Sequence, residues 1–314
     1  MKKFGFTLKK LFSLLKQTYK EWNEDEPFRL SAVVAYYAIF SLPALLIITV
    51  NVAGYFLGKE AVQGEISSQI GGMIGQEAAS SIETMIANAS QQGQSVIAII
   101  IGIATLLFGA TGVFYQLQIS LNQIWGVEIN KDTGIKKLAI DRATSLGLVV
   151  VLGFLLLISL ILTTILSSLS RWINTQLPDI VLPLTYVFEF LISLGVITLV
   201  FALIFKVLPD VKITWHDTWI GALITAIFFV IGKFAIGFYF GQSDPGSVYG
   251  VAGSVILIML WVFYSCLIVF FGAEFTQVFA RRYGSGIRPT SKAHRVEKQP
   301  PFNKNKEKVS SSSS

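Results

Sequence analysis

The chain has 314 residues, of which 53% are hydrophobic and only 14% charged, and its mean hydropathy is +0.63. This composition excludes an ordinary soluble domain and is typical of an integral membrane protein. The net charge of +6 is unevenly distributed, because seven Lys and Arg residues precede the first apolar run and nine follow the last. By the positive-inside rule, both termini are expected in the cytoplasm.

The N-terminal segment, residues 1–28, is expected to lie on the cytoplasmic side as an amphipathic helix and to contain no cleavable signal peptide. Its apolar side chains recur at steps of three and four: Leu8, Leu11, Phe12, Leu15, Tyr19 and Trp22. Two interpretations stay open. The helix lies on an anionic membrane surface, or it docks beneath the bundle as structural packing.

Six apolar runs are each long enough to cross a membrane as a helix, which predicts an all-α polytopic fold with six transmembrane helices. Pro43 lies inside the first run, where it frees the carbonyl of Ile39 and predicts a kink. This kink either lines a substrate path or is only structural. The six expected spans are residues 30–57, 95–125, 143–169, 183–207, 217–240 and 249–280.

Three connecting or terminal segments have their own patterns. Residues 58–93 are expected to form two short amphipathic helices on the outer side, too polar to cross the membrane. Thr214 and Asp217 have the spacing of a capping box that opens the fifth span. The tail, residues 283–314, is basic and rich in Ser and Pro, which predicts cytoplasmic disorder.

Charged residues inside the spans are the first candidates for a functional site, because each costs ~2.5–3.5 kcal/mol at the centre of a membrane helix. There are three: Glu189, Lys233 and Glu274. Glu189 and Lys233 fall at similar depths in sequential antiparallel spans, which predicts an ion pair in the outer half of the membrane. Snorkelling of Lys233 to the surface is the competing interpretation.

Glu274 lies nearer the inner surface, and the order of the spans places it with Tyr36, Tyr37 and Asn122. Arg142 is a further candidate neighbour. One polar site near each membrane face, with Pro43 between them, is the arrangement expected of a path for an amphiphile or small solute. The alternative is that both clusters only hold the helices together.

Enzymatic motifs are absent from the sequence, including the phosphate-binding loop and the metalloprotease, dithiol and serine-hydrolase patterns. One cysteine and two widely separated histidines predict no metal site and no cofactor. We therefore expect no enzyme activity and no nucleic-acid partner. Pairs of glycines four residues apart, such as Gly54 with Gly58 and Gly237 with Gly241, are expected to allow close helix packing.

Three stretches carry a family resemblance. GALITAIFFVIGKFAIGFYF at 221–240 and SVYGVAGSVILIMLWVFYSCLIVFFGAEF at 247–275 form the first, FRLSAVVAYYAIFSLPALL at 28–46 the second, and the run around Leu121 and Trp125 the third. They resemble the YihY/BrkB family of bacterial membrane proteins. The resemblance implies six helices in the cytoplasmic membrane. It implies no settled activity, since some members have carried a ribonuclease label.

The preferred function is a transporter or lipid-translocating protein without its own nucleotide site, in contact with membrane lipids. A scaffold that binds envelope partners through residues 58–93 is the alternative, and a membrane-tethered nuclease comes third. The sequence leaves open the substrate, the coupling ion, the direction of transport and whether the protein forms an oligomer.

Overall fold

The structure is a computed structural model of the chain, and it describes residues 8–74, 79–80, 83–84, 112–130, 182–243, 253–291 and 293–296. The described parts are mostly helical. Their helices are α1 (Leu8–Glu24), α2 (Pro27–Leu57), α3 (Lys59–Ile74), an unlabelled helix at 112–124, α7 (Leu182–Val207), α8 (Trp215–Ser243) and α9 (Gly253–Arg282). Their strands are β1 (Val127–Ile129), β2 (Val211–Lys212), β3 (Arg288–Pro289) and β4 (Ala293–Arg295).

Among the described residues, three stretches are long and apolar enough to cross a membrane: Phe190–Val207, Trp215–Phe240 and Val255–Arg282. They lie in α7, α8 and α9 and match the last three predicted spans, and α2 covers the first. Most of the second expected span and all of the third, 143–169, lie outside the described residues. The total of six spans therefore stays a prediction.

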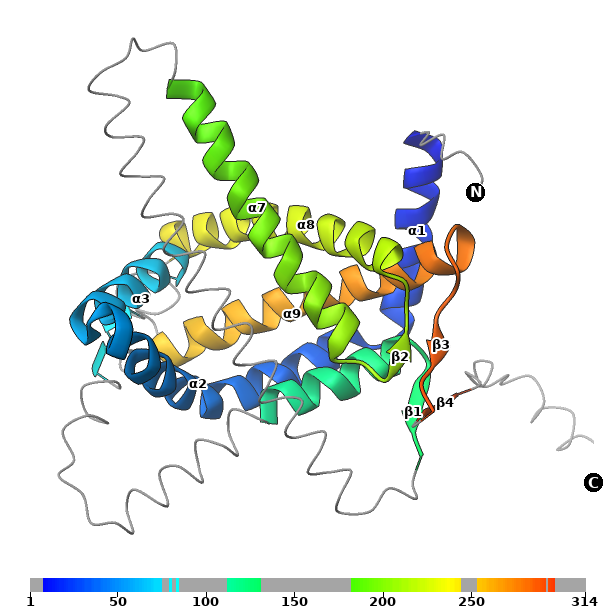
Figure 1. Cartoon of the computed structure of the whole chain (residues 1–314), viewed down its shortest axis with the longest axis horizontal. Coiled ribbons are helices and arrows are strands. Elements are labelled where there is room, and N and C mark those ends of the chain that lie inside the picture. Colours follow the sequence, from blue (N-terminus) through cyan, green and yellow to red (C-terminus); the bar gives the residue numbers. More distant parts are fainter. Residues whose placement is uncertain are drawn as a thin grey trace, which may run out of the picture.

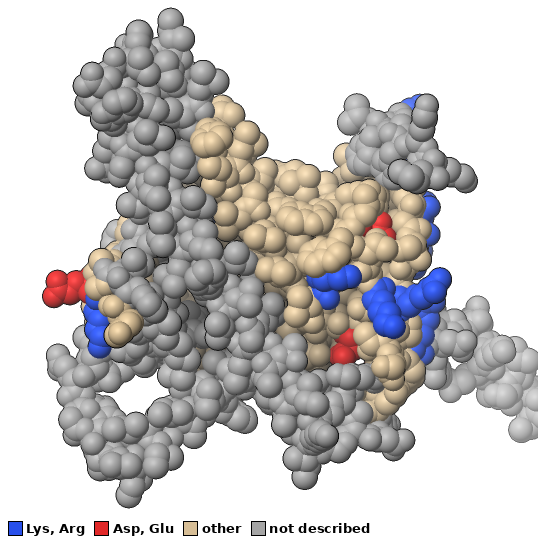
Figure 2. All heavy atoms as spheres, in the orientation of Figure 1, with Lys and Arg blue, Asp and Glu red and all other residues tan. Residues whose placement is uncertain are grey.

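Helix α9 is at the centre of the described bundle (Figure 1). It packs against both α8 and α2, and α1 packs beside it, while α7 packs on α8. We call the end that carries α1 and the strands the α1 end, and the opposite end the α3 end. On the face drawn in Figure 2, Lys and Arg gather at the α1 end, and a smaller charged group lies near α3. The described surface between them is mainly tan, without Lys, Arg, Asp or Glu, as expected where helices face lipid.

Two glycines bring α8 and α9 into close contact. A Cβ atom at Gly221 would lie 1.8 Å from Thr276 Oγ1, and one at Gly272 would lie 1.8 Å from Thr225 Oγ1. Each threonine hydroxyl donates to the glycine carbonyl four residues earlier on its own helix, over 2.7 Å in both cases. Each helix thus places a threonine over the other helix's glycine, which fixes their register. The glycine pairs singled out from the sequence did not include these two positions.

The predicted disorder of the tail is wrong for its first part, because residues 283–291 and 293–296 are ordered. Strand β3 pairs with β2, and β4 pairs with β1, both antiparallel. Ile287 and Ala293 are buried, and Thr290 N donates to the carbonyl of Asp210 over 3.0 Å. The disorder was predicted from the average composition of the whole tail. Two short segments of the tail, β3 and β4, nevertheless pair with strands far away in sequence. Residues 297–314 lie outside the described part.

Helix α1 docks on the bundle through one face only. Leu14 packs with Phe275, Val278 and Phe279 of α9 in a small buried cluster. Phe12, on another face of α1, is 72% exposed. The Leu14 face of α1 is therefore packed on the bundle, as the second interpretation expected. The face that carries Phe12 is exposed, so its contact with a membrane surface stays a prediction.

Candidate functional site

Asp210 is the centre of a buried hydrogen-bond network at the α1 end. Gln118 Nε2 and Asn122 Nδ2, one turn apart on the 112–124 helix, donate to Asp210 Oδ2 over 2.9 and 3.0 Å. The Asp210 backbone N–H donates in return to Asn122 Oδ1 over 2.9 Å. The network fixes the turn after α7 to the 112–124 helix, because each partner would be left unsatisfied without the others.

Glu274, on α9, is fully buried, and its carboxyl group is hydrogen-bonded to Glu21 of α1. Gln277 lies one turn further along α9. In the amide orientation that satisfies its neighbours, Gln277 donates to both Glu274 oxygens over 3.2 Å and to the carbonyl of Ile124 over 3.0 Å. Trp125 Nε1 donates to the carbonyl of Ala273 over 3.0 Å. These bonds connect α1, α9 and the end of the 112–124 helix.

Glu21 joins this buried group to the surface. Burial raises the pKa of Glu21, but hydrogen bonds with Gln17, Glu274 and Arg281 and the charge of Arg281 together bring the pKa below its usual value. Glu21 is therefore ionised near neutral pH. Two carboxyl groups share a hydrogen bond only if one of them carries a proton, so the Glu21–Glu274 pair holds one proton between them.

An open hollow of about 690 Å³ lies beside this group, and we call it the basic hollow. Gln277 and Trp125 are part of its wall, so the buried group reaches the surface there. Its charged lining residues are Lys20, Arg281, Arg282, Arg295, Glu21 and Glu24.

The expected neighbours of Glu274 need correction. Asn122 is bonded to Asp210 and Glu274 to Glu21, so the inner polar cluster is built differently from the predicted one. Tyr36 and Tyr37 are 57% and 37% exposed on α2 and contact each other edge to face, with ring centroids 5.8 Å apart. Depth along the spans could not reveal Glu21, because α1 lies outside them.

Other predicted site residues are only partly described. Helix α2 continues through Pro43, and Ser41 Oγ donates to the carbonyl of Ala38 over 3.1 Å. Lys233 is half-buried on α8. The side chains of Pro43 and Glu189 lie outside the described residues, as does Arg142. The Glu189–Lys233 ion pair therefore stays a prediction.

The expected helix cap is present, since Thr214 Oγ1 donates to Asp217 Oδ2 over 2.8 Å and accepts from the Asp217 backbone N–H over 3.4 Å. Within the described ranges, no group of three or more His, Cys, Asp or Glu side chains is placed to hold a metal ion. His216 contacts Asp217, and His294 contacts Asn130. The two histidines thus belong to separate local contacts.

Curated relatives are similar to this chain over most of its length. A UPF0761 membrane protein of Saccharophagus degradans is 27% identical over 90% of this chain and 62% of its own length. Another, YE0031 of Yersinia enterocolitica, is 26% identical over 62% of this chain and 61% of its own length. The putative ribonuclease-like protein YfkH of Bacillus subtilis is 23% identical over 86% of this chain and 96% of its own length.

The chain spans about three fifths of the length of these two UPF0761 relatives and nearly all of YfkH. No solved structure matches it. The profile of the family described as virulence factor BrkB matches residues 18–297, which is most of the chain. The chain therefore belongs to the BrkB family of bacterial membrane proteins.

Proposed function

We propose that this chain is a membrane transporter or lipid-translocating protein of the bacterial cytoplasmic membrane, with both termini in the cytoplasm. The observation that carries the proposal is the fully buried carboxyl group of Glu274, inside the apolar stretch Val255–Arg282. An ionisable group at such a place is costly, and in membrane proteins it usually marks a pathway or a proton relay.

The surroundings of Glu274 support a pathway. Glu274 is hydrogen-bonded to Glu21, and Glu21 and its partner Arg281 both line the basic hollow. A buried carboxyl group is thus two contacts away from an open, charged surface. If the proton left Glu274, two carboxylates would face each other between α1 and α9, and their repulsion would favour separation of these helices. The contact between α1 and α9 thus has two states, packed and separated, and binding of a proton or an anion shifts the balance between them.

The proposal is tested with purified full-length protein in liposomes. Fluorescent analogues of phosphatidylglycerol and phosphatidylethanolamine report movement between leaflets through quenching by added dithionite, and radiolabelled solutes report uptake. We expect wild-type protein to accelerate one of these processes over protein-free liposomes. Glu274→Ala should reduce the rate, while the matched control Glu128→Gln, on an exposed position of β1, should not.

Rates equal to those of protein-free liposomes in both arms would contradict the proposal. They would favour the scaffold, whose proposed partner surface begins at α3. Melting curves of each variant are needed beside the rates, because loss of folded protein would imitate loss of transport.

A further inference from the structure

We propose that the basic hollow is a binding site for a phosphate group. The hollow lies between α1, the C-terminal end of α9 and the β1–β4 strand pair. The proposal goes beyond the proposed function, because binding there does not require that the bound molecule is transported.

The first step concerns charge. Four cationic and two carboxylate side chains line the basic hollow, which leaves a surplus of two positive charges. Arg281 is paired with Glu21. Lys20, Arg282 and Arg295 remain for a ligand, opposed only by Glu24. A surplus of this size matches a phosphate monoester, whose charge at neutral pH is between one and two negative units, and it also attracts the single negative charge of a lipid phosphodiester.

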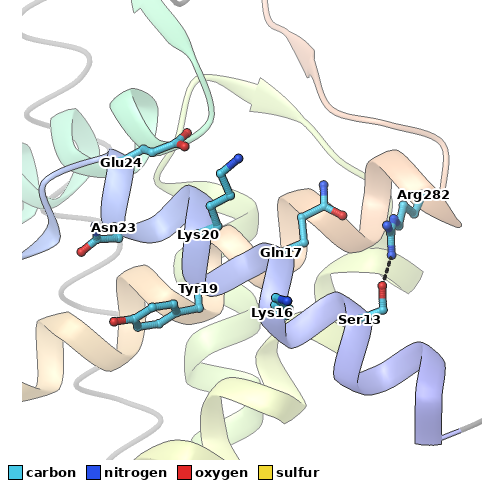
Figure 3. A pocket seen from close by; sticks show the side chains of 8 residues that line it. All are labelled: Ser13, Lys16, Gln17, Tyr19, Lys20, Asn23, Glu24 and Arg282. Carbon is cyan, nitrogen blue, oxygen red and sulfur yellow. Dashed lines mark hydrogen bonds between the residues drawn. The ribbon is translucent and has the colours of Figure 1, made fainter. Parts of the chain in front are cut away.

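The second step concerns donors that are free to bind. Among the described residues, the Lys20 ammonium makes no hydrogen bond and no ion pair. Arg282 donates from Nη1 to Ser13 Oγ over 3.1 Å, as Figure 3 shows, and Arg295 donates from Nη2 to the carbonyl of Ile287 over 3.4 Å. Each guanidinium keeps further N–H groups, and the planar guanidinium fork matches two phosphate oxygens at once.

The third step concerns assembly. Lys20 comes from α1, Arg282 from the end of α9, and Arg295 from β4, which is held in place by its pairing with β1. The fold therefore brings together three cations from separate elements, and Arg281 is held close by Glu21. Cations on elements that are fixed to one another lose less freedom on binding than cations on a flexible segment.

The fourth step concerns depth. The apolar stretch of α9 ends at Arg282, so the hollow lies where a spanning helix leaves the lipid, at the level of phosphate headgroups. A second hollow of about 540 Å³ is drawn in Figure 3, and it shares Gln17, Lys20, Glu24 and Arg282 with the basic hollow. It adds Tyr19, which is 60% exposed and lies on the other side of α1 from Lys20 in this view.

The shared chemistry therefore has two sources: the phosphodiester of an anionic lipid, or a soluble phosphate ester. A lipid would also need apolar surface, which the exposed ring of Tyr19 in the adjoining second hollow offers, whereas a soluble ester would use the cations alone.

The test measures binding to full-length protein in a neutral detergent. The probes are dioctanoyl phosphatidylglycerol, dioctanoyl phosphatidylcholine, glycerol 3-phosphate and inorganic phosphate. The binding variant is Lys20→Gln with Arg295→Gln. The matched control is Lys9→Gln with Lys212→Gln, which removes the same charge from an exposed position of α1 and an exposed position of a strand outside the hollow.

We expect saturable binding of at least one anionic probe, and about a tenfold or greater loss of affinity in the binding variant but not in the control. Binding of phosphatidylglycerol alone identifies a lipid headgroup, and binding of glycerol 3-phosphate identifies a soluble ester. Absence of binding by all three anionic probes, or equal losses in both variants, overturns the site. If the binding variant unfolds, Lys20→Gln alone, on an exposed position of α1, gives the same comparison.

Discussion

The placement of one proton predicts that two similar substitutions differ in effect. If Glu21 is ionised and Glu274 carries the proton, Glu274→Gln keeps the hydrogen bond with Glu21 and one of the two from Gln277. The new amide N–H donates to Glu21, and the new amide oxygen accepts from Gln277. Substitutions that conserve volume in this way usually cost less than about 1.5 kcal/mol.

Glu21→Gln has a different consequence, because it removes the charge paired with Arg281 and leaves an amide N–H facing a donor. A hydrogen bond to a charged group contributes about 1.5–3 kcal/mol. The Arg281 side chain is 42% exposed, so solvent screening lowers this figure to about 1–2 kcal/mol. We therefore expect Glu21→Gln to lower the thermal midpoint in detergent more than Glu274→Gln does.

The assay is thermal unfolding at pH 7, with Glu128→Gln as the control for loss of one surface charge. The reverse order, with Glu274→Gln the more destabilising, would refute the proton placement. The pKa of Glu21 is lowered from 4.5, so its contribution to stability is fully present above that value and is lost as pH falls through the lowered pKa of the folded state. The midpoints of wild type and Glu21→Gln should therefore converge in acid.

Three further predictions concern packing, topology and chemistry. Gly221→Ala should cost about 1–3 kcal/mol, because its Cβ would overlap Thr276, whereas Gly237→Ala on the same helix, with nothing within 4 Å, should be neutral or stabilising by up to about 1 kcal/mol. In a Cys266→Ser background, a cysteine at Ser80 should react with an impermeant thiol reagent added to intact cells, and one at Lys131 should not. Labelling at Lys131 would contradict cytoplasmic termini. Purified protein should leave RNA intact with and without divalent metal, and metal-dependent cleavage abolished by one acidic substitution would contradict this.

The long helices were predictable because apolar length decides them locally. The expected spans 183–207, 217–240 and 249–280 correspond to α7, α8 and α9, with boundaries that differ by at most four residues. A helix cap also involves only residues close in sequence, so the pairing of Thr214 with Asp217 could be predicted from their spacing alone. An inner polar cluster was also predicted, with Asn122 and Glu274 among its members.

The partners of these polar residues were not predictable from depth or spacing. Asp210 lies in a short turn and Glu21 in an amphipathic helix, and neither position differs in pattern from a solvated surface residue. Strands of two and three residues have no periodicity to detect, so β3 and β4 were assigned to a disordered tail. In each case the decisive contact joins segments at least 76 residues apart. Such contacts depend on how the whole chain packs, so the pattern of a single sequence does not reveal them.

Glu21 connects the buried carboxyl group to the basic hollow, and this gives a prediction with opposite signs for stability and binding. Glu21→Gln should lower stability, yet it frees Arg281 and raises the charge surplus of the hollow by one unit. If the hollow binds phosphate, affinity for the anionic probe should rise by about three- to tenfold in this variant. Glu274→Gln should leave affinity unchanged, because Glu21 and Arg281 stay paired. Weaker binding in Glu21→Gln would show that the carboxylate positions Arg281 for the ligand rather than competing with it.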